Sequence, residues 1–384
     1  MAKFAPEIVM ATIHIHQKDN WLTTKDNSES NNTKRYRVLS IDGGGMRGLY
    51  SCAYLQGMAS TGKARYGAEL SDFGKKFDLI VGTSTGAILG AGLAAGIPLS
   101  EICNLYTEFG QQIFPEKLPD KPTNLIFHRR SKLNKCGDES LRKALGSKFH
   151  ELTLGQLYQN RQIGLAITAV NCTTHRAYVF KTPHDKTSNH RDDDVTLVDA
   201  CLASSAAPIY RSIAVINQED SPLDNSMFID GGLWANNPVL VALIEALRNA
   251  DNDQEIEIFC LGTSPAPSGS VLDQGSPHWG LLKWKFGGRA IEYAMDSQSV
   301  VYDQMAGMLL THINRDISIT RFPQPVPSAE QAPLLALDDA SQKAMTLLKQ
   351  LAARAVDETN QLINTGDEKG KRIAALFGDN DACD

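Results

Sequence analysis

The sequence predicts an α/β protein with three layers, in which helices cover both faces of a mostly parallel central sheet. Short apolar runs of strand length alternate along the chain with longer segments of helical periodicity, a pattern typical of successive β–α–β units. Several of the apolar runs end directly at glycine, where a strand turns into the following helix. Together these observations favour a doubly covered, mostly parallel sheet.

The expected elements follow from these patterns in chain order. An apolar run closed by glycines predicts the first strand, and the spacing of residues 49, 52, 53 and 56 predicts a helix face behind it. Strands are predicted over residues 38–41, 77–81, 163–170, 177–180, 227–229 and 255–261. Helices are predicted over residues 49–60, 197–205, 239–249, 289–310, 341–356 and 371–376, and a small-residue helix follows Gly82 and ends at Gly96 and Pro98.

The chain divides into a leader and one domain. Residues 18–35 are polar and rich in Asn and Ser, which predicts a flexible N-terminal leader over residues 1–35. Residues 36–384 show no internal repeat and no shift in composition, so we interpret them as one domain ending in C-terminal helices. No secretion signal is recognisable, and the nearly apolar run 87–99 is too short to cross a bilayer. We expect a cytoplasmic protein; if its substrate is a membrane lipid, it must approach the inner face of the membrane from water.

The composition indicates a globular protein without a nucleic-acid partner. Of the 384 residues, 42% are hydrophobic and 21% are charged, which allows a substantial core. The formal charge of −6 lacks the basic field that attracts phosphate backbones. The seven cysteines form no CxxC pair and lie mostly in apolar runs, so we expect reduced, buried thiols without a disulfide framework. No acidic calcium loop or His/Cys cluster predicts a metal site.

A glycine-rich loop follows the first predicted strand. Residues 42–48 read Asp-Gly-Gly-Gly-Met-Arg-Gly and open a helix. Consecutive glycines let backbone N–H groups approach a ligand closely, and the helix dipole favours negative charge there, so the loop suits a phosphate or a developing oxyanion. A tight turn is the plainer alternative. The loop also fits a dinucleotide fingerprint, but the acidic residue that such a site needs further along is missing.

A second glycine motif lies between the next strand and helix. Residues 82–86 read Gly-Thr-Ser-Thr-Gly, which matches the Gly-x-Ser-x-Gly pattern of a nucleophile elbow. Small residues at both ends let the chain turn sharply and hold the hydroxyl of Ser84 out at the carboxyl end of the strand. We therefore predict Ser84 as a nucleophile.

A serine nucleophile needs a base, and the sequence offers two kinds. Asp230 follows the predicted strand 227–229 and precedes two glycines, which places a carboxylate at a strand end. By itself it could equally be a turn or cap residue. Histidines follow Ser84 at positions 128, 150, 175, 184, 190, 278 and 312, none in a glycine-flanked strand-end loop. A Ser-His-Asp esterase using His278 or His312 stays open at this point.

These three motifs, in this order, resemble the patatin-like phospholipases. Segments 106–114, 203–210 and 337–341 are also similar to plant patatin, so the resemblance spans about residues 36–357. It implies a three-layer patatin-like fold and a lipid acyl hydrolase of the phospholipase A type, without a cofactor or metal. A constitutive housekeeping lipase would carry the same motifs, whereas the intact Ser-Asp pair and glycine loop weigh against a storage-type patatin. A nicotinamide oxidoreductase is the least favoured alternative.

The resemblance also implies roles for individual residues. Ser84 attacks the ester carbonyl, Asp230 takes its proton, and the N–H groups of Gly43, Gly44 and Gly45 form the oxyanion hole. Arg47 fixes the loop or steers a lipid phosphate. A free aspartate, with a pKa near ~3.9, is a weak base, so burial must raise its basicity or proton transfer must be concerted with attack.

The partners implied are a phospholipid membrane surface and a nucleotide. Residues 276–288 and 125–130 mix apolar, aromatic and basic side chains, as interfacial loops do. Compact bacterial members of the family serve in anti-phage defence, where a cyclic nucleotide switches the lipase on. The stretch 42–50 and the Asp-Gly-Gly at 230–232 resemble those members, which implies a cyclic dinucleotide as activator. The sequence leaves oligomeric state open.

Overall fold

A computed structural model describes residues 34–67, 72–115, 124–218, 221, 223–263, 284 and 287–378, with backbone alone for 124–131 and 378. Residues 1–33 of the predicted leader, and most of the predicted interfacial segment 276–288, lie outside the described residues. Segment 125–130 lies within a helix. Among the described helices, none combines the length and hydropathy needed to span a bilayer.

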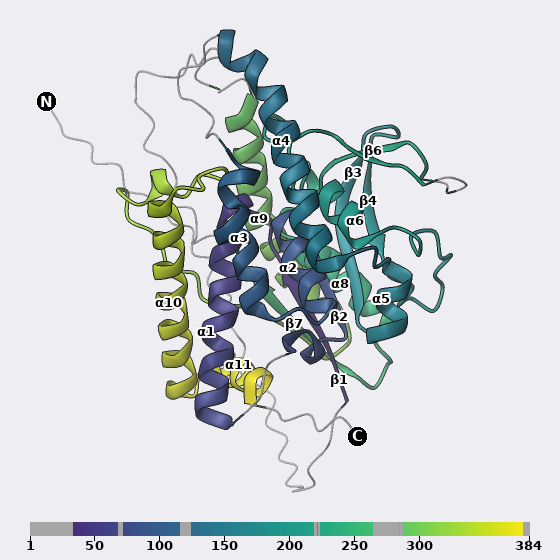
Figure 1. The fold of residues 1–384 in the computed structure, drawn as a ribbon. Helices are drawn as coiled ribbons and strands as arrows, with labels where there is room; N and C mark the ends of the chain where they lie inside the picture. The colour runs from purple at the N-terminus through teal and green to yellow at the C-terminus, as the bar shows by residue number, and fades with distance from the viewer. Residues whose placement is uncertain are drawn as a thin grey trace, which may run out of the picture. The chain divides into compact units, whose positions relative to one another are not determined.

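One central sheet holds eight strands of the described chain (Figure 1). Their order is β5-β6-β3-β2-β1-β7-β8, with β4 also paired to β3. The pairs β1/β2, β1/β7, β2/β3 and β7/β8 are parallel, whereas β3/β4, β3/β6 and β5/β6 are antiparallel. The strands are β1 (Arg35–Ile41), β2 (Leu79–Thr83), β3 (Gly164–Asn171), β4 (Arg176–Lys181), β5 (Ala214–Ile216), β6 (Ser226–Asp230), β7 (Glu255–Leu261) and β8 (Ile317–Arg321).

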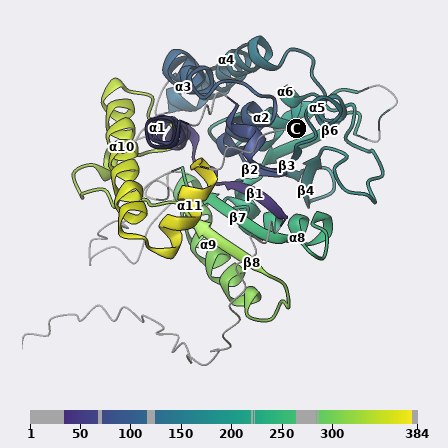
Figure 2. The same cartoon turned by 90° about the horizontal axis from the view of Figure 1, so that it is seen from below.

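Helices cover both faces of this sheet (Figure 2), which confirms the predicted three layers. On one face lie α1 (Gly48–Tyr66), α2 (Thr85–Ala94), α5 (Leu154–Arg161) and α6 (Leu197–Ser204). Outside them pack α3 (Leu99–Ile113), α4 (Asn124–Phe149), α10 (Gln342–Thr365) and α11 (Glu368–Gly378). The other face carries α7 (Gly232–Ala235), α8 (Val239–Asn249) and α9 (Gly288–Leu310). Short 3₁₀ turns are η1 (Gly45–Arg47), η2 (Phe73–Lys76) and η4 (Ala332–Leu334).

The strands of the sheet are apolar on both faces because helices bury both faces. Alternate side chains of β1 point to opposite cores: Leu39 and Ile41 join the cluster under α1 and α2, and Val38 joins the cluster under α8. This double burial explains why the central strands read as continuous apolar runs.

Most predicted elements form, and two, β7 and α8, have the predicted bounds. β2 begins two residues later than predicted and includes Gly82 and Thr83. Six elements are not predicted from the sequence: α3, α4, α5, α7, β5 and β8. The helix α3 has a clear apolar face, with Leu99, Ile102 and Tyr106 buried, so its period was available in the sequence. The strand β5 has three residues, too few to show a period.

The prediction that the cysteines form no disulfide is wrong for one pair. Cys52 of α1 and Cys103 of α3 form a disulfide, with their Cα atoms 5.7 Å apart. Both lie in the apolar core, where a free thiol and a half-cystine have the same sequence context. Cys136, Cys172, Cys201 and Cys260 are free, and Cys136 is exposed rather than buried.

Thiol titration in denaturant tests this disulfide. Protein purified without reductant should show two fewer reactive thiols than the same protein after reduction. Because the bridge closes a separation of 51 residues, its reduction should lower the free energy of unfolding by about 4 kcal/mol on the loop-entropy model. Cys103→Ser should abolish the difference between the two samples; equal counts in both wild-type samples would contradict the pairing.

Candidate active site

Ser84 lies at a strained turn between β2 and α2. Its backbone has φ 55° and ψ −122°, a conformation that residues with side chains rarely adopt. A Cβ atom on Gly82 would lie 2.6 Å from the carbonyl oxygen of Gly86, and one on Gly86 would lie 2.5 Å from that of Asp42. Both flanking glycines are therefore required, as a nucleophile elbow requires. The N–H of Ser84 donates to Ser204 Oγ at 2.8 Å.

The register of β3 brings Asp230 to Ser84. Along β3, β2 pairs with Gly164 to Thr168, and β6 then pairs with Ala169 to Asn171. Because β4 occupies the opposite edge of β3, β2 and β6 share one edge and meet there with their carboxyl ends facing. Ser84 follows the end of β2, and Asp230 is the last residue of β6. Two strands that run in opposite directions thus place the hydroxyl and the carboxylate together.

The two side chains form a buried hydrogen-bonded pair. Ser84 Oγ donates to Asp230 Oδ2 at 2.7 Å, and the N–H of Gly232 donates to Asp230 Oδ1 at 2.6 Å. Burial raises the pKa of Asp230 to about 6, against the opposing effects of these two hydrogen bonds and of the Arg211 charge. Asp230 is therefore ionised at neutral pH yet more basic than a free aspartate. Burial is thus one source of the added basicity that an aspartate needs to act as a base for Ser84.

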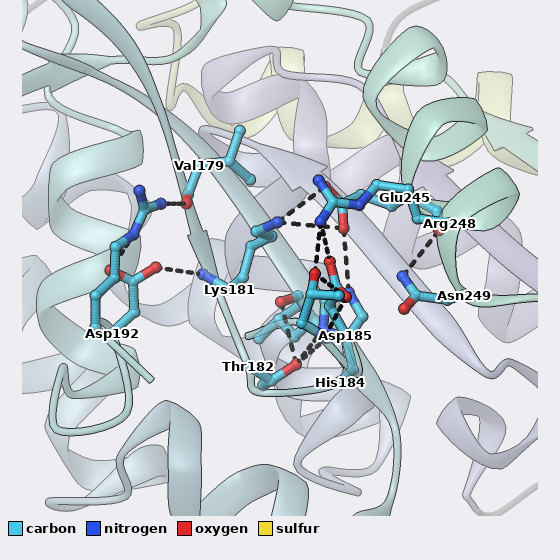
Figure 3. A network of polar contacts seen from close by, with 12 residues as sticks. Val179, Lys181, Thr182, His184, Asp185, Asp192, Glu245, Arg248 and Asn249 are labelled. Carbon is cyan, nitrogen blue, oxygen red and sulfur yellow. Dashed lines mark hydrogen bonds and ion pairs between the residues drawn. The ribbon is translucent and has the colours of Figure 1, made fainter. Parts of the chain in front are cut away.

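The described histidines lie elsewhere. His184 accepts or donates a hydrogen bond at Thr182 Oγ1 (2.8 Å) and lies 3.4 Å from Glu245 Oε2, in a polar network with Lys181 (Figure 3). His190 pairs with Asp193. His312 does not line the pocket described below; His278 and the side chain of His128 lie outside the described residues. Within the described chain, the partner of the Ser84 hydroxyl is Asp230.

The glycine loop runs beside Ser84, because Ile41 at the end of β1 pairs with Gly82. A Cβ atom on Gly43 would lie 3.3 Å from Ser84 Cβ, one on Gly44 would collide with Thr263, and one on Gly45 would collide with the carbonyl oxygen of Leu337. Gly45 also has φ +58°. Larger side chains would not fit at these three positions.

The three glycine amides are not equivalent. The N–H of Gly43 donates to the carbonyl of Asn236 at 2.8 Å and is committed to the fold. Those of Gly44 and Gly45 meet no acceptor in the part of the chain that the structure describes. Of the predicted oxyanion-hole donors, these two are available to a ligand.

Arg47 is tied to the glycine loop itself. Its Nε donates to the carbonyl of Gly44 at 3.3 Å. Burial lowers the pKa of its guanidinium, and the nearby carboxylates of Asp296 and Glu292 on α9 oppose that effect. These contacts favour loop fixation over phosphate steering.

A cluster of ion pairs around Arg321 supports the loop from behind. Arg321 of β8 donates to Asp42 Oδ2 at 2.7 Å and to Asp303 Oδ1 of α9 at 2.8 Å, and Asp303 Oδ1 also accepts from Asn237 Nδ2 at 2.7 Å. Burial raises the pKa of Asp42 to about 6, and Arg321 opposes the rise. Arg321 is not identified from the sequence, because it lies 279 residues from Asp42 and no local pattern marks it.

Ser84 and Asp230 lie in a pocket with a mainly apolar wall. The lining comes from the glycine loop, α2, α3, α4, α9 and the segment after α6. It includes Met46, Ile88, Leu105, Tyr106, Ile113, Phe114, Leu141, Met295 and Leu337, with Tyr210 and Arg211 as polar members. These lining residues are not identified from the sequence, although segments 106–114 and 203–210 carry part of the resemblance.

Comparisons with known proteins agree with this site. The family model described as Patatin-like phospholipase matches residues 39–243, a range that contains the glycine loop, Ser84 and Asp230. A cGAMP-activated phospholipase of Vibrio cholerae is 31% identical, over 89% of this chain and 94% of the relative. One of Pseudomonas aeruginosa is 33% identical, over 64% and 68%. A cUMP-AMP-activated phospholipase of Escherichia coli is 28% identical, over 66% and 72%.

The buried Asp230 carboxylate should lower the free energy of unfolding at high pH. The pKa rises from 3.8 in the unfolded chain to about 6 in the fold, so the protonated form is favoured, and this group destabilises the protein progressively as pH increases from about 4 to 6. At ~1.4 kcal/mol per pKa unit, the loss is ~3 kcal/mol above pH 6. Asp230→Asn removes the charge and should be ~1–3 kcal/mol more stable than wild type at pH 8.

Urea unfolding at pH 8 and pH 4.5 measures this effect. The stability difference between Asp230→Asn and wild type should shrink at the lower pH, and the exposed control Asp251→Asn should show no such pattern. If Asp230→Asn is no more stable at pH 8, the charge of Asp230 is not costly in the fold.

Proposed function

The chain belongs to the patatin-like phospholipase family, and we propose that it releases fatty acids from membrane phospholipids through an acyl-enzyme on Ser84. The observation that carries this proposal is the 2.7 Å hydrogen bond from Ser84 Oγ to a buried carboxylate inside an apolar pocket. A hydroxyl paired with a base and backed by free backbone amides is the arrangement that acyl transfer needs.

The reaction follows from the contacts. Asp230 Oδ2 accepts the proton of Ser84 as Ser84 Oγ attacks the ester carbonyl carbon. The N–H groups of Gly44 and Gly45 hydrogen-bond the developing oxyanion. The tetrahedral intermediate collapses, the lysolipid alcohol leaves with the proton from Asp230, and the acyl group stays on Ser84. Water then attacks the acyl-enzyme, Asp230 accepts the proton of water and returns it to Ser84, and the fatty acid is released.

The pocket accounts for the acyl part of the substrate. Leu105, Ile113, Phe114 and Leu141 give it an apolar wall that suits a hydrocarbon chain. With the chain held there, the ester carbonyl lies at the Ser84 end.

A cyclic dinucleotide is the proposed activator, and anti-phage defence the proposed biological role. Support comes from relatives whose names specify activation by cGAMP or by cUMP-AMP, one of them matching over 94% of its length. The enzyme would act on the inner face of the cell membrane. A constitutive lipase is the alternative that the assay below separates.

The exposed side of α9 is the proposed membrane-facing surface. Eleven positions of α9 are exposed and none carries a charge. They are Ala290, Tyr293, Ala294, Ser297, Val300, Val301, Gln304, Met305, Gly307, Met308 and Leu309. Uncharged exposed patches of this kind mark interaction sites. Trp284, from the predicted interfacial segment, contacts Tyr293 with ring centroids 6.2 Å apart, and aromatic rings at a boundary suit a lipid interface.

The position of α9 connects this surface to the site. Met295 of the same helix lines the pocket, and Glu292 accepts a hydrogen bond from Tyr210 at 2.9 Å. A bilayer against the exposed side of α9 would therefore lie one helix diameter from the pocket.

Charges on this surface should weaken membrane binding. Val301→Glu combined with Met308→Glu should reduce co-sedimentation with phosphatidylethanolamine/phosphatidylglycerol vesicles at least ~10-fold, because each glutamate must be desolvated on contact. Ile244→Glu, on an exposed apolar position of α8, is the matched control and should bind like wild type. Equal binding by both variants would place the membrane-facing surface elsewhere.

Fatty-acid release from the same vesicles tests the reaction. Wild type, Ser84→Ala and Asp230→Ala are compared, each alone and with cGAMP or cUMP-AMP. Each substitution should lower the rate at least ~10³-fold, since nucleophile and base act as one unit. Dependence of wild-type release on one nucleotide would support the switched enzyme. Release without nucleotide would favour a constitutive lipase, and activity surviving either substitution would refute the Ser-Asp mechanism.

A further inference from the structure

Arg211 is a buried cation beside Ser84 and Asp230. The proposed acyl-transfer steps do not use it. Its side chain is 5% exposed, and it lines the same pocket as Ser84 and Asp230. The Arg211 charge lowers the pKa of Asp230, so the guanidinium lies within electrostatic reach of the reacting groups. Burying an arginine is costly, and its position at the site suggests a ligand.

Arg211 also lines a second pocket, which is charged. This outer pocket is formed by Lys135, Asp138, Glu139 and Arg142 of α4, by Leu202, and by Arg211 to Val215. Arg211 therefore stands in the wall that the apolar and the outer pocket share. With three cationic and two acidic side chains, the outer pocket has a formal charge of +1.

The guanidinium of Arg211 is held from one side. Its Nη2 lies 2.7 Å from Asp138 Oδ1, and the N–H of Ser212 donates to Asp138 Oδ2 at 3.1 Å. Arginine has five N–H donors, and the Asp138 contact uses one nitrogen. An oriented arginine with donors left over is suited to a planar, two-point contact with a phosphate.

We propose that the outer pocket is a phosphodiester subsite in which Arg211 binds the headgroup phosphate of the phospholipid substrate. This inference rests on the proposed function. The order of sites then follows the order of groups in a phospholipid: acyl chain in the apolar pocket, ester at Ser84, phosphate at Arg211, headgroup in the outer pocket. Lys135 adds positive charge for the phosphate, whereas Arg142 is already paired with Asp199 at 2.9 Å. Asp138 and Glu139 give an amine headgroup its counter-charge.

A cyclic dinucleotide also contains phosphodiesters, so the same chemistry has a second source. The lipid is favoured because Arg211 lines the pocket of Ser84 as well as the outer pocket. A substrate bound for cleavage must occupy the first, whereas an activator need not.

The test compares a lipid with a phosphate and one without it. Activated enzyme is assayed on dioleoyl phosphatidylethanolamine and on dioleoylglycerol in the same mixed micelles, and the ratio of the two kcat/KM values is measured. Arg211→Gln should lower this ratio about 10–100-fold, which is the worth of a charged hydrogen-bonded contact, and Arg211→Lys should lower it less. Arg248→Gln removes an arginine ion-paired with Asp185 in the separate network of Figure 3, and should leave the ratio unchanged.

The double variant Arg211→Gln/Asp138→Asn is the control for folding, because it leaves no unpaired carboxylate. It should unfold in urea close to wild type and still show the lowered ratio. Equal loss on both lipids, or no loss on either, would overturn the subsite.

A second measurement distinguishes a nucleotide phosphodiester from a lipid phosphodiester at Arg211. It is the activator concentration that gives half-maximal hydrolysis of dioleoylglycerol. If Arg211→Gln raises that concentration and leaves the lipid ratio unchanged, the phosphodiester belongs to the nucleotide and the lipid assignment is wrong. Wild type that hydrolyses neither lipid at any nucleotide concentration would instead refute the proposed function.

Discussion

The site depends on two strands that meet end to end on one edge of β3. If β6 continued the parallel pattern of β2, its carboxyl end would not face that of β2, and Asp230 would not reach Ser84. The junction is reinforced on β3 itself: Thr83 Oγ1 and Thr168 Oγ1 lie 2.7 Å apart, and Trp234 Nε1 donates to the carbonyl of Ala169 at 2.8 Å. The antiparallel strand in a mostly parallel sheet is therefore what brings Ser84 and Asp230 together.

Charge burial is the common feature of the groups around this junction. Asp230, Asp42 and Arg211 are all buried, and each has partners that offset the cost of burying its charge. Asp230 is hydrogen-bonded to Ser84 and Gly232, Asp42 is paired with Arg321, and Arg211 is paired with Asp138. The partners come from different elements, so the ion pairs and hydrogen bonds also hold those elements together. For Asp230, burial still raises the pKa, and the carboxylate is therefore ionised and more basic than a free aspartate near neutral pH.

The helix α9 has two unlike sides. Toward the protein, Gln298 and Ser299 accept hydrogen bonds from Asn236, and Asp303 accepts hydrogen bonds from Asn237 and Arg321. These contacts place α9 behind both the glycine loop and the turn after Asp230. Toward solvent it presents uncharged residues along its length. A contact on the outer side of α9 is one packed layer away from the amides of Gly44 and Gly45.

Local features can be read from the amino-acid sequence alone. The glycine loop and the Ser84 elbow were predicted because each is a strand, a turn and a helix within a few residues, and glycine is the residue that such turns require. The bounds of β7 and α8 followed from short-range periodicity in the same way. Asp230 was identified by resemblance, since its own context equally fits a turn. Four other features are seen only in the folded protein: β6 runs antiparallel, Gly43 donates its N–H to Asn236, Cys52 pairs with Cys103, and Arg211 and Arg321 lie at the site. Each of these depends on contacts between distant segments, up to 279 residues apart for Asp42 and Arg321, and such contacts form only when the layers pack.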